Sequence, residues 1–349
     1  MKSLILPALL REQFKRFWAI SALTMLFYLL FVFLPIYSDS GHSQVRSVIS
    51  LLNGESMALI AVFLSPFLAV IPLFSYLFSS NSTTFFHALP ASKNQLLFTN
   101  MLAGLVLILV PLLILSILLL IPIHTPMAAD LPEWARMPSI GGQTLAEGEL
   151  INTFSRVAQF FLHTAIIKIS IFTLFVLAAN LAGTLAIAVL LCVFVPFLPI
   201  LIHFIIDYFL FDHFSFPRIY RAVLDDIMDI IFGFHILRTL LVLPAIYYCY
   251  HRRKLERTGD AIVFYPVKNF LVFLFSIYGM VLMGISFHHL LGSDAVYIGF
   301  VLGFLLTFIV LQMIMEKTFQ IRHKLKSLPI FTGIAAAGYL GLLIIYLFT

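Results

Sequence analysis

The sequence predicts an all-α, polytopic membrane protein, and three observations support this class. Of its 349 residues, 62% are hydrophobic and only 11% are charged, and the mean hydropathy is +1.06. Soluble domains carry about 25% charged residues. The apolar residues gather into runs of about 20 residues, the length that crosses the hydrocarbon core as a helix. Basic residues cluster between these runs, as they do in the loops of membrane proteins.

The apolar runs predict nine membrane-spanning helices. Helices are expected because an open strand would leave its backbone groups unsatisfied in lipid. The predicted spans are Phe17–Tyr37, Met57–Phe78, Leu97–Ile123, Val157–Ala179, Leu185–Ile206, Asp229–Tyr250, Asn269–Phe287, Tyr297–Ile314 and Ile330–Phe348. The short turn at residues 180–184 contains Asn and Gly, which favour a reversal between two helices, although one broken helix is the alternative.

The distribution of basic residues orients the chain. If the spans alternate, most of the 21 Lys and Arg residues fall on the same side as the N-terminus. Cytosolic loops are rich in these residues, so the formal charge of +5 does not indicate nucleic-acid binding. We expect a multi-pass membrane protein with a cytosolic N-terminus.

This orientation divides the chain into membrane and loop segments. The expected cytosolic segments are 1–16, 79–94, 251–268 and 316–329, and the larger outer loops are Ser38–Ser56, His124–Arg156 and Asp207–Met228. Residues 1–16 predict an interfacial amphipathic helix, because apolar side chains such as Leu9 alternate with charges such as Arg16. Residues 17–250 form a predicted six-span core, and residues 269–349 contain three additional spans.

The sequence contains none of the common motifs for enzymatic chemistry. It has no Gly-x-x-x-x-Gly-Lys-Ser/Thr loop, no His-Glu-x-x-His, no Cys-x-x-Cys and no Gly-x-Ser-x-Gly. Cys192 and Cys249 lie in apolar runs and predict no disulfide framework. We therefore expect no enzymatic activity, no metal site and no directly bound cofactor. Any uphill transport would draw its energy from a partner or from an ion gradient.

The first internal cytosolic loop, over residues 79–96, is a candidate partner-binding element. Pro90 disfavours helix at Leu89, and Ser92 is placed to cap a new helix that begins near Lys93. Exposed aromatic groups on a short loop suit insertion into a groove of another protein, although they could instead lie among lipid headgroups. The candidate contact residues are Phe85, Phe86, His87, Leu89, Pro90, Ser92 and Lys93.

The second cytosolic loop, 251–268, is a further candidate. Its basic residues fit a positive-inside anchor, but this does not explain the acidic residues or the apolar Ile262, Val263 and Phe264. Gly259 is expected to end the helix that continues the sixth span. The candidate residues of this loop are Arg252, Arg253, Glu256, Gly259 and Asp260.

These loops carry a family resemblance. The pattern Phe-Phe-His-Ala-Leu-Pro-Ala-Ser-Lys, followed by Leu-Leu-Phe, resembles the first cytosolic loop of bacterial type 2 ABC transporter permeases. Residues Arg252–Phe264 resemble the loop after the sixth span in the Ytr-type subgroup, and Glu316–Arg322 is similar to a third, weaker motif. That family has a six-span core, so the last three spans here would be additional.

The resemblance implies a permease subunit of an ATP-driven exporter in the bacterial plasma membrane. The subunit would pair with separate ATP-binding cassette subunits, which carry ATP and Mg, and with a second permease copy or a paralogue. It would move an amphiphilic or antimicrobial-type substrate and so contribute to antibiotic resistance. The first cytosolic loop would be the coupling element, and Asp207–Met228 would form short re-entrant elements. The alternatives are an ion-driven secondary carrier and a non-transporting sensor or scaffold of a resistance system.

Two cations lie within predicted spans, Lys168 in the fourth and Arg238 in the sixth. A charge at the bilayer centre costs about 2.5–3.5 kcal/mol on insertion scales, so each is expected to face protein or water. They could line a translocation cavity that meets a lipid-like headgroup. The alternative is structural: Arg238 would pair with Asp229 or Asp207, and Lys168 would extend to the cytosolic edge.

Overall fold

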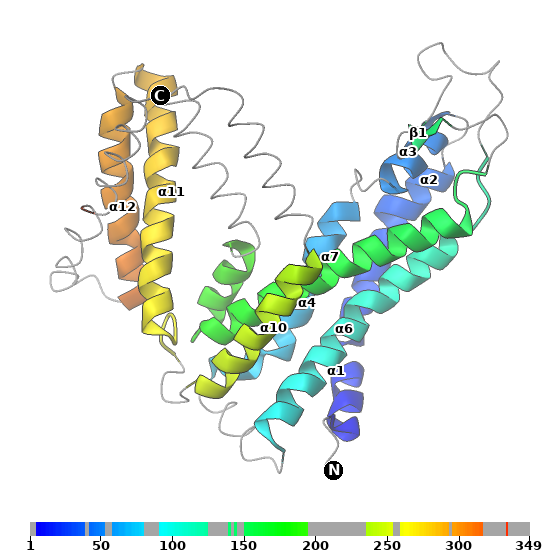
Figure 1. Ribbon diagram of the computed structural model, residues 1–349, viewed down its shortest axis with the longest axis horizontal. Helices are drawn as coiled ribbons and strands as arrows, with labels where there is room; N and C mark the ends of the chain where they lie inside the picture. Colours follow the sequence, from blue (N-terminus) through cyan, green and yellow to red (C-terminus); the bar gives the residue numbers. More distant parts are fainter. Residues whose placement is uncertain are drawn as a thin grey trace. The chain divides into compact units, whose positions relative to one another are not determined.

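The structure is a computed structural model that describes residues 5–38, 42–52, 58–79, 91–124, 139–140, 143–144, 150–194, 235–253, 259–292 and 295–316, together with Gly333. It is mostly helical (Figure 1). Five helices in this part of the chain are long and apolar enough to cross a membrane: Pro7–Ser38, Lys93–Leu118, Phe154–Leu181, Val267–Leu291 and Val296–Met315. They correspond to the first, third, fourth, seventh and eighth predicted spans.

The remaining predicted spans are shorter, or extend beyond the described residues. The second is represented by helix α4, Ala58–Leu73, and the described part of the fifth by the apolar helix Leu185–Phe194. The sixth overlaps α10, His235–Arg252. The ninth lies outside the described residues, so the number nine stays a prediction. The chain divides into two compact units by its internal contacts, and each is described by itself.

In the first unit, α1 (Pro7–Tyr28) continues through a π-helical turn, η1 (Leu29–Phe33), into α2 (Leu34–Ser38). Proline at the first turn begins the helix, because its fixed φ suits that position. Helix α1 continues through residue 16, so the predicted interfacial segment and the first predicted span share one continuous helix. Contacts with α6 (Lys93–Leu118) hold this end, with the Leu6 amide donating to Thr99 Oγ1 and Gln13 Nε2 donating to Asn100 Oδ1.

A hydrophobic core joins α1, η1 and α2 to α6 and α7 (Phe154–Leu181). The expected outer loop after α2 also contributes, because α3 (His42–Leu52) buries Val45, Val48 and Leu51 in this core. The loop between α6 and α7 contains a two-residue pair, β1 (Ser139–Ile140) with β2 (Gln143–Thr144), in antiparallel register. Thus the predicted outer loops contain secondary structure that hydropathy alone did not indicate.

The end of α6 is closed by Asn152. Its side-chain nitrogen donates to the carbonyls of Leu119 and Ile121, and its side-chain oxygen accepts from the Ile123 amide. The amide of Ile151 also donates to the carbonyl of Ile123. The last carbonyls of a helix have no partner within the helix, so this asparagine satisfies part of the backbone where α6 ends.

In the second unit, α11 (Tyr265–Leu291) and α12 (Val296–Glu316) pack as an antiparallel pair (Figure 1). Glycine permits the close approach: a Cβ at Gly303 would collide with the Gly279 carbonyl, and one at Gly299 with the Met283 carbonyl. Small residues four positions apart are common at contacts between membrane helices. Gly292 ends α11 with a positive φ of 96°, a conformation that glycine adopts without strain.

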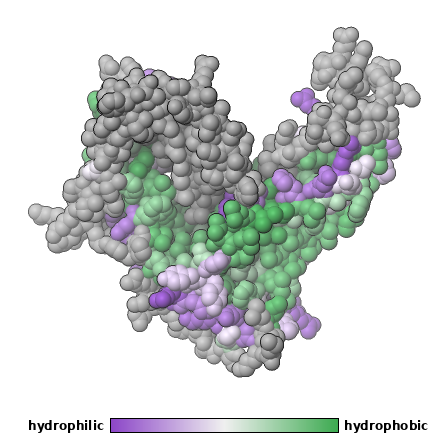
Figure 2. Space-filling model, viewed as in Figure 1, coloured by the Kyte–Doolittle hydropathy of each residue, from purple (hydrophilic) through white to green (hydrophobic). Residues whose placement is uncertain are grey.

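On the face that Figure 2 shows, much of the described helical surface is hydrophobic. On α6, Val110, Leu113 and Ile117 are exposed, and on α10 Leu240 and Leu241 are exposed. Large exposed apolar surfaces are uncommon in soluble monomers. Together with the five apolar helices, they define a multi-pass, α-helical membrane protein.

Candidate functional site

The clearest polar site in the second unit is a junction of backbone segments, which we call the loop junction. It consists of Leu77, the end of α7 with its following turn (residues 178–183), Arg253, and residues 259–263. Leu77 lies in η2, a short 3-10 helix of residues Ser75–Phe78 that precedes the first predicted cytosolic loop. Arg253 directly follows α10, at the start of the second loop. The junction thus contains the segment just before the first loop and the start of the second.

Arg253 is the centre of the loop junction and is only 4% exposed. Its Nη2 donates to the Leu77 carbonyl at 2.7 Å, and its Nη1 donates to the Asn180 carbonyl at 2.7 Å and more distantly to the Ala179 carbonyl at 3.5 Å. A guanidinium presents its donors in a rigid planar fork, so it can bind two chain segments at once. A cation is also favoured at the carbonyl end of a helix, here α7.

The turn after α7 pairs with the end of the second loop. The Gly259 amide donates to the Gly183 carbonyl at 2.8 Å, the Gly183 amide donates to the Ala261 carbonyl at 3.2 Å, and the Val263 amide donates to the Leu181 carbonyl at 2.9 Å. Ala182 and Ile262 form an antiparallel bridge. The buried Ala261, Ile262 and Val263 therefore have a structural role in the second loop that a basic membrane anchor would not require.

These bonds account for the four last carbonyls of α7. Ala178 accepts from the Ala182 amide, Leu181 accepts from the Val263 amide, and the two carbonyls between them accept from Arg253. The last carbonyls of a helix have no partner within the helix, and a buried carbonyl without a hydrogen bond costs free energy. The second loop therefore supplies the C-terminal cap of α7.

The structure corrects part of the prediction for the second loop. The helix of the sixth span ends at Arg252 rather than at Gly259. Gly259 instead has a positive φ of 107° where the chain turns towards residues 181–183, a conformation that favours glycine. Arg252 and Asp260 are exposed. Glu256 lies outside the described residues.

The first loop is described only at its ends. The predicted contact residues Phe85, Phe86, His87, Leu89 and Pro90 lie outside the described residues. The predicted cap is confirmed: Ser92 Oγ accepts from the Gln95 amide at 3.2 Å, the Ser92 amide donates to Gln95 Oε1 at 3.0 Å, and α6 begins at Lys93. This reciprocal arrangement is a capping box.

Lys168 lies in the first unit and is completely buried. Its Nζ donates to Ser65 Oγ at 2.9 Å and to the Ile108 carbonyl at 3.4 Å, and it lies 5.0 Å from the centre of the Tyr28 ring. The lysine of α7 thus contacts α4, α6 and α1. The expectation that it extends to the cytosolic edge is wrong, because the ammonium is held within the helix bundle.

Arg238 on α10 is partly buried and also binds neutral groups. Its Nε donates to Ser170 Oγ on α7 at 2.7 Å, and its Nη2 donates to His235 Nδ1 at 2.8 Å. The predicted partners Asp207 and Asp229 lie outside the described residues. Lys168 and Arg238 therefore each link a neighbouring helix to α7, although their partners are different from those that sequence reasoning considered.

Sequence reasoning missed the buried position of Arg253. The residue is one of several basic residues in a row, and nothing in their spacing distinguishes Arg253 from the exposed Arg252. The only available indication was the apolar segment that follows, because apolar residues in a basic loop need a surface to pack against. No known family model, curated protein or solved structure matches this chain.

Proposed function

We propose that the chain is the permease subunit of an ATP-driven exporter, and that separate ATP-binding cassette subunits dock on the first cytosolic loop. The observation that carries this proposal is the loop junction. A loop that receives force from a partner needs a firm connection to the membrane helices. The junction provides one at Leu77, where Arg253 bonds the segment before the loop to the end of α7.

The two ends of the first loop are suited to transmit motion in this scheme. On one side, Ser92 caps α6 and makes the loop continuous with a 26-residue helix. On the other, Arg253 holds Leu77 and the α7 carbonyls. ATP binding by the cassette subunits would displace the loop, and α6 and α7 would follow. A second permease copy or a paralogue would complete the transporter, and the cargo would be an amphiphilic or antimicrobial-type compound.

The proposal is tested with the full chain expressed beside candidate cassette subunits. The double variant Phe86→Ala, Leu89→Ala is expected to lower the amount of cassette subunit that co-purifies, or to abolish substrate-stimulated ATP hydrolysis. Phe154→Ala is the matched control, because this aromatic residue is 76% exposed at the start of α7, on the predicted outer side. Unchanged co-purification and unchanged stimulation in the double variant would exclude docking on this loop.

The energy source separates the proposal from its alternatives. Transport by the proposed exporter stops when ATP is depleted and persists when an uncoupler collapses the ion gradient. The opposite pattern would identify an ion-driven carrier. Co-purification with a cassette subunit, without any stimulated ATP hydrolysis or transport, would instead identify a sensor or scaffold.

A further inference from the structure

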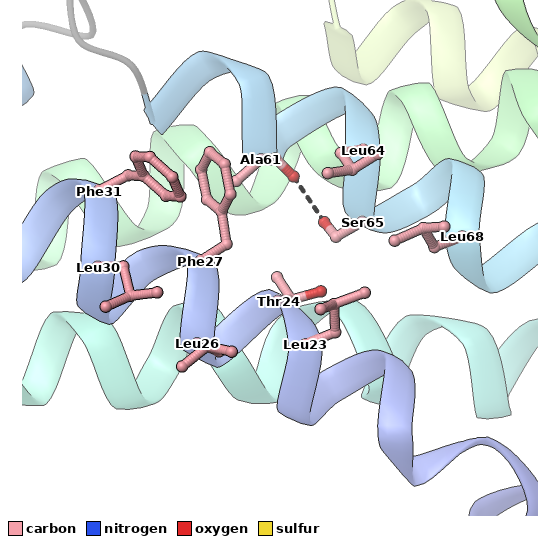
Figure 3. Close-up of a pocket in the computed structure, with 10 residues that line it drawn as sticks. All are labelled: Leu23, Thr24, Leu26, Phe27, Leu30, Phe31, Ala61, Leu64, Ser65 and Leu68. Carbon is pink, nitrogen blue, oxygen red and sulfur yellow. Dashed lines mark hydrogen bonds between the residues drawn. The ribbon is translucent and has the colours of Figure 1, made fainter.

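A hollow of about 180 Å³ lies in the first unit between α1 with η1 and the facing helix α4 (Figure 3). We call it the α1–α4 groove. Large side chains such as Leu26, Phe31 and Leu64 form its rim, and all three are substantially exposed. Small side chains form its floor: Ala61 and Ser65 are one helical turn apart on α4, and Thr24 faces them from α1.

The floor contains hydroxyl groups but offers no free polar group to a ligand. Ser65 Oγ donates to the Ala61 carbonyl at 2.7 Å, which is the dashed line in Figure 3, and accepts from Lys168. Thr24 Oγ1 donates to the Ile20 carbonyl at 2.9 Å. Hydroxyl groups that bond to the preceding turn of their own helix leave mainly carbon atoms at the helix surface. The accessible surface of the groove is accordingly apolar.

The shape of the groove is fixed from both sides. The π-helical turn η1 begins just after Tyr28 and places Leu30 and Phe31 at the rim. Such turns interrupt α-helices frequently at functional sites. On the other side, Lys168 holds Ser65 while its ammonium lies against Tyr28. The same lysine therefore contacts both helices that bound the groove, from behind its floor.

The position of the groove indicates what it meets. It is lined on α1 and η1 by residues from Leu23 to Phe31, within a segment that is long and apolar enough to span a membrane. These positions extend over about 12 Å at 1.5 Å per residue. The medium around an exposed face of such a span is hydrocarbon. A linear, unbranched alkyl chain fits an elongated groove with an apolar surface, whereas a polar ligand would lose its hydrogen bonds there.

We propose that the α1–α4 groove binds an alkyl chain of a membrane phospholipid. This inference does not depend on the proposed transport function, because it needs only the membrane class of the protein and the geometry of one helix pair. The gain comes from packing rather than from the hydrophobic effect, since lipid tails already surround the helices. An alkyl chain therefore binds in the groove in preference to the other exposed helix faces, and the difference in affinity is small.

The test uses the purified full chain in nanodiscs of phosphatidylcholine and phosphatidylglycerol, without ATP or partner subunits. A small fraction of the phosphatidylcholine carries a photoactivatable diazirine on one acyl chain, and adducts are mapped by peptide sequencing. We expect about threefold more adducts on the groove residues Leu26 and Leu64 than on Leu113 and Val110, because packing alone distinguishes the sites. The latter two are exposed to a similar degree on α6 but lie outside the groove.

A variant that fills the groove with a larger side chain provides a second test. Leu64→Trp is expected to reduce groove adducts to the level of the α6 face, whereas Leu113→Trp leaves them unchanged. Leu64→Phe repeats the test if the tryptophan variant does not purify as a single species. The proposal would be overturned if equally exposed groove and α6 residues carried equal numbers of lipid adducts. It would also be overturned if neither Leu64→Trp nor Leu64→Phe reduced the groove adducts. Disulfide cross-links between two copies that carry Leu64→Cys, without lipid adducts on the groove, would overturn it as well and identify a subunit contact.

Discussion

Each unit buries one cation that binds uncharged groups, and the two cations bind these groups in different ways. Lys168 of the first unit binds a serine hydroxyl, one helix carbonyl and an aromatic ring. Arg253 of the second unit binds backbone carbonyls from two segments, Leu77 and the end of α7. The lysine is a compact point charge, and the arginine is a fork that can join segments.

This difference predicts that the stability of the fold depends more on Arg253 than on Lys168. If Lys168 is removed, the Ser65 hydroxyl keeps its bond to the Ala61 carbonyl. If Arg253 is removed, the carbonyls of Leu77, Ala179 and Asn180 lose the bonds that its buried guanidinium donates. A buried group left unsatisfied is more costly than a buried charge that is replaced by an apolar side chain of similar size. The following variants test this ranking, from the largest expected effect to the smallest.

Arg253→Ala is expected to destabilise the protein by about 3 kcal/mol, because a hydrogen bond to a charged group contributes about 1.5–3 kcal/mol and the variant loses more than one of them. The measurement is the thermal unfolding midpoint of the full chain in nanodiscs. Arg252→Ala is the matched control, since the neighbouring arginine is exposed. Arg253→Lys should recover only part of the loss, because an ammonium lacks the planar fork. Equal midpoints for both alanine variants would show that the loop junction does not depend on Arg253.

Ser92→Ala tests the cap of α6, whose hydrogen bonds join residues only three apart in the sequence. It is expected to cost about 1 kcal/mol, which is typical for the loss of a helix N-cap. The first turn of α6 should fray, and amide hydrogen exchange at residues 94–96 should accelerate while the middle of α6 is unaffected. Ser286→Ala is the control, because the Ser286 hydroxyl bonds only to the Leu282 carbonyl within α11. Unchanged exchange at the start of α6 would contradict the capping role.

Lys168→Met should have the smallest effect on stability, within about 1 kcal/mol of the parent, because the methionine side chain fills a similar volume without a buried charge. The same thermal measurement applies. Lys168→Ala is the control for volume and should be less stable than Lys168→Met, because it leaves a cavity. A loss as large as that of Arg253→Ala would contradict the ranking. Loss of transport at unchanged stability would assign Lys168 to function rather than to the fold.

The sequence predicted features that depend on neighbours along the chain. Ser92 directly precedes the helix that it caps, so its role as an N-cap could be predicted from the local sequence. The structure adds the reciprocal bond to Gln95, which completes a capping box. Gly259 was identified as a turn residue for the same reason, although the end of α10 was misplaced. Residues 1–16 were predicted as an interfacial helix apart from the first span, but no proline or glycine lies between Pro7 and Pro35 to break the helix there.

The partners of the charged residues could not be predicted in this way. Lys168 and Ser65 are 103 residues apart, and Arg253 and Leu77 are 176 residues apart. The α1–α4 groove is equally dependent on tertiary structure, since it exists only where small side chains of one helix face large ones of another. Such contacts follow from how helices pack, and the spacing of residues in one segment does not contain that information.

By itself, the sequence determined that this protein is a helical membrane protein, because apolar runs of this length and a charge content this low leave no other way to satisfy backbone and solvent. It also determined that cations within the spans need partners. Only the tertiary structure decided which groups those partners are: for Lys168 they are a hydroxyl, a carbonyl and a ring. It also revealed that Arg253, a residue of the second loop, is buried against the end of α7. The physical reason is that a buried polar group needs hydrogen-bond partners wherever it lies, whereas the partners belong to segments that only the fold brings near.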